Sequence, residues 1–266
     1  MARISSEAKQ RYFDKVQEYK HAAEAILERE KSIHQTIRGE EPGEQYKRLT
    51  LADERLNLAS YYLLLNRVSV GLLGVKNEAF LNDARKSCYQ AIIYLEEVVT
   101  GYIDAPFSEY SEYLEKIEDL DDAKRYHLMR KLGFTIRSVE DDFGDNTKWR
   151  WSFVELEGRF AVVCKNIIDM KTLLAGLDPR VEGYDARVAH LKLVKQWLQR
   201  AAERYREKYE ISTNRIDDFK LAIEFLGALR RVHVVLGEAD NAEVIKRKMD
   251  VWKSKMETDE RQARQK

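Results

Sequence analysis

Two residues near the start of the chain have a spacing that is used to bind metals. Glu18 and His21 lie three positions apart, which places both side chains on one face of a helix. A di-iron site in a helical bundle needs two such Glu-x-x-His motifs and two further glutamates. Of the five histidines, only His21 has an acidic residue three positions before it. We therefore interpret His21 as a surface residue and expect no metal site and no cofactor.

Catalytic motifs are equally scarce. Ser6 and Lys9 match the Ser-x-x-Lys spacing of some acyl-transfer enzymes, but those enzymes need further motifs on a mixed α/β fold. The chain contains no glycine-rich phosphate loop, no Gly-x-Ser-x-Gly and no His-Glu-x-x-His. We interpret Ser6 as a helix cap. The sequence thus predicts no catalytic residue.

A basic stretch at residues 187–208 and an acidic stretch at residues 109–122 polarise a chain whose formal net charge is zero. Arg200, Arg204 and Lys208 belong to the basic stretch and are our candidate contacts for a partner. Opposite charges can steer docking of a protein partner or self-association. Alternatively, these stretches are solvated helix faces with local ion pairs. The zero net charge argues against nucleic acid.

These candidate residues should all lie on helices. Apolar side chains recur at steps of three and four residues almost everywhere in the chain, which is the spacing of an amphipathic helix. The chain is 44% hydrophobic and 35% charged and has only three prolines. No run alternates strictly, so we expect no sheet. The predicted fold is all-α, with seven to nine helices paired as antiparallel hairpins. The expected helices cover about residues 6–38, 45–74, 78–100, 109–122, 123–141, 149–174, 181–211, 215–236 and 242–256.

The apolar stripes of these helices differ. Residues 45–74 carry two stripes, which predicts a central helix that is buried on more than one side. Residues 6–38 carry one narrow stripe, which Glu30 interrupts where an apolar residue is due. Residues 149–174 have the most regular periodicity in the chain. Gly158, in the middle of that helix, indicates that another helix packs closely there.

Turn residues suggest three parts. We expect an N-terminal helical bundle at residues 1–103, acidic connecting helices at 104–146 and C-terminal hairpins at 147–266. A further turn is expected at residues 39–43. The polar N-terminus shows no secretory signal, and the two cysteines lie too far apart to indicate a disulfide framework. We therefore expect a cytoplasmic protein with buried thiols and no transmembrane segment.

Two short segments share the form Leu-Gly-x-x-x-x-Ala. They are residues 73–79 and 236–242, where glycine ends one helix and alanine lets the next helix approach closely. This resembles the turn between the two helices of a tetratricopeptide repeat, best over residues 223–253. The chain departs from that family's pattern at Arg67 and Arg230, where a small residue is preferred. The fold is thus either a short solenoid of such hairpins or an irregular bundle.

The resemblance implies a rigid surface that binds peptides or assembles larger machines. Proteins of this kind include scaffolds such as bacterial flagellar motor collars. It also implies that Arg231, on the first helix of the best-matching hairpin, contacts a partner.

We therefore expect a non-enzymatic scaffold or adaptor that binds a protein partner or a second copy of itself. The alternative is an all-α enzyme or ligand-binding bundle, whose pocket would be assembled from scattered residues. Nucleic-acid binding through residues 187–208 is a third hypothesis, which the charge balance disfavours.

Overall fold

The computed structural model describes residues 5–37, 43–145 and 147–264. These residues form ten α-helices and one π-helical segment, without a strand. The predicted all-α fold with antiparallel neighbours is confirmed. Nine of the described helices have seven or more residues, in agreement with the expected seven to nine. None of the described helices is both long and apolar enough to span a bilayer.

The chain forms two compact units. Unit 1 comprises Met1–Val98, Lys116–Asp119 and His127–Lys148, and unit 2 comprises Val99–Glu115, Leu120–Tyr126 and Trp149–Lys266. The division of residues 1–103, 104–146 and 147–266 into three separate parts remains a prediction. The expected turn at residues 39–43 lies, except for Gly43, outside the described residues.

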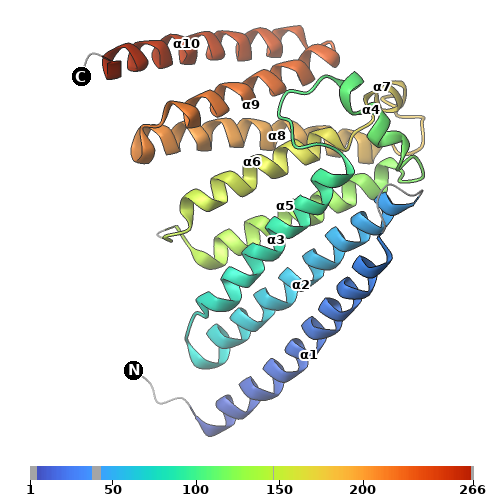
Figure 1. The fold of residues 1–266 in the computed structure, drawn as a ribbon, viewed down its shortest axis with the longest axis vertical. Coiled ribbons are helices and arrows are strands. Elements are labelled where there is room, and N and C mark those ends of the chain that lie inside the picture. The colour runs from blue at the N-terminus through green and yellow to red at the C-terminus, as the bar shows by residue number, and fades with distance from the viewer. Residues whose placement is uncertain (1–4, 38–42, 146, 265–266) are drawn as a thin grey trace. The chain divides into compact units, whose positions relative to one another are not determined.

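Unit 1 is built around three long helices. They are α1 (Ser6–Thr36), α2 (Glu44–Leu73) and α3 (Glu78–Val98), and most of α5 (Asp122–Phe143) belongs to the same unit. In Figure 1, α2 lies between α1 and α3, and it packs against both. Leu51, Leu56, Leu58 and Leu65, taken from both predicted stripes, are fully buried. The central position predicted for α2 is confirmed.

The ends of these helices follow ordinary capping chemistry. The cap of α1 is Ser5, one residue before the expected Ser6, and its hydroxyl accepts a hydrogen bond from the Ala8 amide at 3.1 Å. Gly74 ends α2 with φ +67°, in the left-handed region that glycine adopts without strain. Asn77 then caps α3, because its side-chain oxygen accepts hydrogen bonds from the amides of Ala79 and Phe80.

Unit 2 contains the remaining helices. They are α4 (Phe107–Glu115), α6 (Arg150–Asn166), α7 (Met170–Ala175), α8 (Tyr184–Lys208), the π-helical η1 (Tyr209–Thr213), α9 (Ile216–Val235) and α10 (Ala239–Arg264). Helix α8 packs against α6 and α9, and α9 packs against α10. Gly237, with φ +71°, makes the turn between α9 and α10. The two Leu-Gly turns of the sequence therefore both join consecutive antiparallel helices.

The close packing expected at Gly158 is confirmed. A Cβ atom added to this glycine of α6 would lie 2.8 Å from Cε2 of Tyr205 and 3.1 Å from Cζ of Phe225. The two rings stack with centroids 5.5 Å apart. Glycine is thus required here because side chains from α8 and α9 occupy the space that a Cβ would need.

The single helix expected at residues 149–174 is interrupted. Helix α6 ends at Asn166 and α7 begins at Met170. The side chain of Asn166 donates hydrogen bonds to the carbonyls of Thr100 and Tyr102, and Asp169 caps the new helix through the Lys171 amide. The spacing of apolar residues carries no information about such hydrogen bonds. The break between α6 and α7 could therefore not be predicted from the apolar pattern. One consequence is that Leu174, expected to be internal, is 43% exposed.

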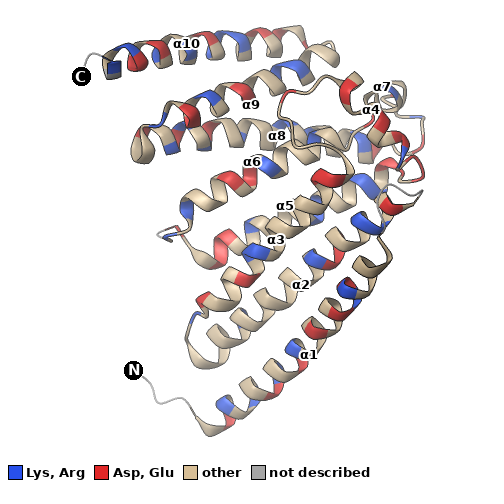
Figure 2. Ribbon diagram, viewed as in Figure 1, with Lys and Arg blue, Asp and Glu red and all other residues tan. Residues whose placement is uncertain are grey.

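Both cysteines are buried free thiols, Cys88 in unit 1 and Cys164 in unit 2, as expected from the sequence. Charged residues of both signs are interspersed along α1 and α10 (Figure 2). In the whole chain, 46 acidic residues balance 46 lysines and arginines.

Candidate functional site

The cations expected to contact a partner already have carboxylate partners inside unit 2. Arg200 donates from Nε and Nη2 to Oε1 of Glu157 at 2.8 and 2.5 Å. Nε of Arg204 lies 3.5 Å from the other oxygen of the same carboxylate. Glu157, on α6, has no exposed surface. Two arginines of α8 thus neutralise one buried acid of α6.

Lys208 and Arg231 each have a separate partner. Lys208 donates to Asp218, a buried residue of α9, at 2.8 Å. Arg231 donates to Asp104 from Nε and Nη2 at 2.7 and 3.0 Å. The hydrogen bond to Asp104 raises the pKa of Arg231 above its ordinary value. Among the four predicted contacts, only Arg200 and Arg204 meet on a shared group. Their role as contacts for a partner remains a prediction.

The metal-type spacing at the N-terminus does not develop into a site. Glu18 and His21 are both exposed, and Glu18 forms an ion pair with Lys15 at 2.7 Å. The described residues include no cluster of three or more histidine, cysteine or acidic side chains that could hold a metal ion.

A polar cluster that sequence reasoning missed lies in unit 1. Its four members, which we call the Glu30 cluster, come from three helices: Glu30 and His34 from α1, Arg55 from α2 and Tyr94 from α3. Glu30 occupies an inward-facing position of α1 and is almost fully buried. Its interruption of the apolar stripe was the only signal in the sequence. The partners could not be predicted, because they lie 25 and 64 positions further along the chain.

Glu30 is held from both sides. Nε and Nη2 of Arg55 contact its two carboxylate oxygens, each at 2.7 Å, in a bidentate ion pair. The hydroxyl of Tyr94 donates to Oε1 of Glu30, also at 2.7 Å. Burial and, after it, the hydrogen bond to Glu30 raise the pKa of Tyr94 to about 12. The phenol therefore keeps its proton at neutral pH.

His34 completes the cluster. Its Nε2 lies 2.6 Å from the hydroxyl of Tyr94. Because Tyr94 gives its only proton to Glu30, Nε2 of His34 must donate to the tyrosine oxygen. In the neutral imidazole, Nδ1 is then an acceptor. The side chain of His34 is about half exposed, so this acceptor lies where a bound group can reach it.

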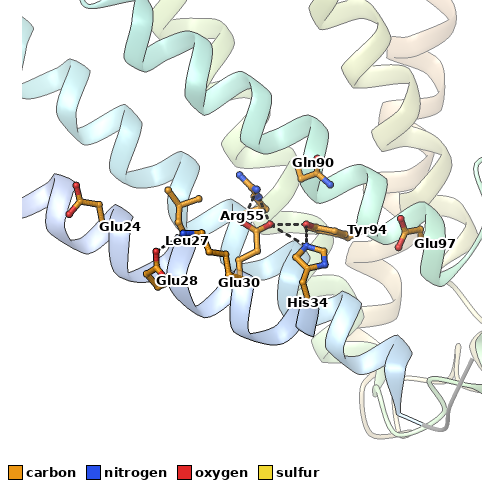
Figure 3. A pocket seen from close by; sticks show the side chains of 10 residues that line it. Glu24, Leu27, Glu28, Glu30, His34, Arg55, Gln90, Tyr94 and Glu97 are labelled. Atoms are coloured by element: carbon orange, nitrogen blue, oxygen red, sulfur yellow. Dashed lines mark hydrogen bonds and ion pairs between the residues drawn. The ribbon is translucent and has the colours of Figure 1, made fainter. Parts of the chain in front are cut away.

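The Glu30 cluster lies along a cleft of about 620 Å³, which Figure 3 shows. Further acids line the cleft: Glu24 and Glu28 on α1 and Glu97 on α3. Glu28 forms an ion pair with Lys31 at 2.6 Å, and Glu97 forms one with Arg48 at 3.0 Å. We call this surface the acidic cleft, since its lining carries four carboxylates against the two cations Lys31 and Arg55.

The geometry of the acidic cleft is suited to binding. Glu30, its most buried acid, accepts hydrogen bonds from Arg55 and Tyr94 and so is a poor general base. What the cleft offers a ligand is the carboxylate of Glu24, the outer edges of three ion-paired acids and the imidazole acceptor of His34.

Fold and site together define an all-helical protein with a preformed acidic cleft. The model of the TP0443 family matches residues 8–260, and the chain belongs to this family. Comparisons with curated proteins and with solved structures gave no match.

Proposed function

We propose that the chain is a non-enzymatic scaffold or adaptor and that its acidic cleft binds a partner protein through lysine or arginine side chains. The observation that carries the proposal is an exposed carboxylate, Glu24, at the cleft whose other three acids are held by cations of the chain. Glu24 has no ion pair in the described part of the chain, so its charge is available to a partner. Complementary charge of this kind gives specificity and speeds association.

The hairpin architecture is consistent with this role. Helices α2 and α3, and again α9 and α10, are joined by turns whose glycines adopt positive φ. The resemblance of these turns to those of tetratricopeptide repeats favours a scaffold that presents helix faces to partners. Membership of that repeat family is part of the proposal.

Charge reversal on α1 tests the proposal. The double variant Glu24→Lys/Glu28→Lys changes the sign of one wall of the cleft, and both positions are exposed, so the fold should not change. Affinity capture from the native cell, quantified by mass spectrometry, should recover a partner with the parent chain and lose it with this variant. The partner should cross-link to residues of the cleft.

The matched control is Asp14→Lys/Glu18→Lys, which makes the same change at the same spacing on the same helix, outside the cleft. It should retain the partner. Equal capture by all three chains, or capture of no protein by any of them, contradicts the proposal.

The alternative of a ligand-binding bundle is also favoured by one observation. Unit 2 contains a mainly apolar pocket that is lined by the buried Lys165. A small ligand there is compatible with an adaptor function of unit 1.

A further inference from the structure

A second hollow, which we call the Lys165 pocket, lies within unit 2. It has a volume of about 190 Å³. Its walls are mainly apolar and come from α4, α7 and α9: Phe107, Tyr110, Leu174, Val232 and Val235. An apolar cavity of about 150 Å³ can hold one benzene molecule. The pocket can therefore hold a compact apolar group about the size of benzene.

One charged side chain lines the pocket from α6. Lys165 is only 4% exposed, and its ammonium lies 5.3 Å from the centre of the Tyr110 ring. It has no hydrogen bond and no ion pair with any described residue. A buried ammonium without a partner is costly, and a charged group of this kind normally acquires one.

The neighbouring charges do not provide that partner. Asp104 and Arg231 lie close enough to act on Lys165 in opposite directions, but they bind each other in a bidentate pair. Lys171, on α7, lies over the ring of Phe107 and adds another cation. Tyr110 keeps its proton, because burial raises its pKa to about 12. Burial is the main cause that lowers the pKa of Lys165, to about 8.

We propose that the Lys165 pocket binds a small organic carboxylate with a compact apolar body, held through an ion pair with the Lys165 ammonium. The carboxylate supplies the missing acceptor, and the body replaces water at the apolar walls. A cationic ligand would be repelled, and a neutral hydrocarbon would leave the ammonium without a partner. A phosphate needs more donors than one lysine, and the guanidinium of Arg231 is already bound to Asp104.

Calorimetric titration of the full chain tests this with benzoate, phenylacetate and hexanoate as probes. At least one of them should bind at a single site. Its uncharged amide should bind at least about tenfold more weakly, since a charge-assisted hydrogen bond is lost. No saturable binding of any of the three acids at roughly 10 mM overturns the proposal.

Two variants locate the site. Lys165→Met keeps the apolar stem and removes the charge, so affinity should fall at least about tenfold while the chain stays folded. Lys192→Met removes an exposed charge of the same unit and should leave affinity unchanged. Circular dichroism confirms folding of both. Unchanged affinity in the Lys165→Met variant overturns the proposal.

The pH dependence gives an independent readout. The ligand needs protonated Lys165, whose pKa in the free chain is about 8. Affinity should therefore change little below about pH 7 and fall as the pH rises through about 8, by up to tenfold for each pH unit, until it levels off above the pKa of Lys165 in the complex. An affinity that stays flat up to pH 10 contradicts the proposed ion pair.

Discussion

His190 is a buried histidine whose ionisation is coupled to folding. It is 3% exposed, and because a carbonyl can only accept, its Nε2 donates to the Cys164 carbonyl at 3.0 Å. Burial, with a smaller effect of the nearby Arg125, lowers its pKa to about 4. At about pH 8 and above, the imidazole is neutral in both folded and unfolded chains, so it makes no pH-dependent contribution there.

As pH falls below 6.5, the unfolded chain takes up a proton at His190 and the folded chain does not. The free energy of unfolding should therefore fall by roughly 1.5 kcal/mol between pH 6.5 and 5 from this residue alone. In His190→Gln, whose amide can still donate to Cys164, this slope should disappear. Urea unfolding at several pH values measures it.

His127→Gln, at an exposed position of α5, is the control and should keep the slope of the parent chain. Identical slopes in the parent chain and His190→Gln would show that His190 does not titrate in this way.

Buried acids play a similar role in both units. Glu30 is held by Arg55 of the next helix, and Glu157 is held by Arg200 and Arg204 of α8. Such pairs contribute little net stability, because desolvation offsets the attraction. Breaking one leaves an uncompensated charge, so each pair disfavours alternative alignments of the two helices. We regard the α8 arginines primarily as fixing the register of α8 on α6.

At the scale of elements, Gly158 shows how close two helices can come. Alanine at this position would gain about 1 kcal/mol in helix propensity. Its Cβ would also press on the buried, stacked rings of Tyr205 and Phe225, which have no room to move. Overpacking of this kind costs about 1–3 kcal/mol.

The overpacking cost outweighs the gain, so we predict that Gly158→Ala lowers the free energy of unfolding by up to about 2 kcal/mol. Gly71→Ala, in α2, is the matched control, because nothing lies within 4 Å of the added Cβ. It should raise stability by up to about 1 kcal/mol. Denaturant unfolding compares the two variants. Stabilisation by both substitutions would contradict the packing argument.

Periodicity predicted most helices, because burial of one face dominates where each helix lies. The central position of α2 and the close approach at Gly158 followed from the same physics. The interruption after Asn166 did not, because it depends on hydrogen bonds to Thr100 and Tyr102 that periodicity does not encode. The acidic cleft had one local sign, Glu30. The Lys165 pocket had none, since it is assembled from four helices and a loop.

At the scale of the whole molecule, the basic stretch is largely neutralised by acids of the same chain. Most cations of the basic stretch at 187–208 are paired within unit 2, and Arg187 binds Asp122 of the acidic stretch at 2.6 Å. Little of that charge remains for counterion release, which drives non-specific binding to nucleic acids. The family match extends over residues 8–260 and so includes most of both units.

The reactivity of the two buried cysteines measures how often each unit unfolds locally. Each unit contains one, and burial raises the pKa of both thiols. A thiol-specific reagent reacts with the thiolate, which is scarce in a buried thiol with a raised pKa. Cys88 and Cys164 should therefore be modified only after the surrounding helices separate. Peptide mapping after timed alkylation should thus give two rates, one for each unit. Equal rates would indicate that both units open in one cooperative event. Unequal rates would identify the unit that unfolds locally more often.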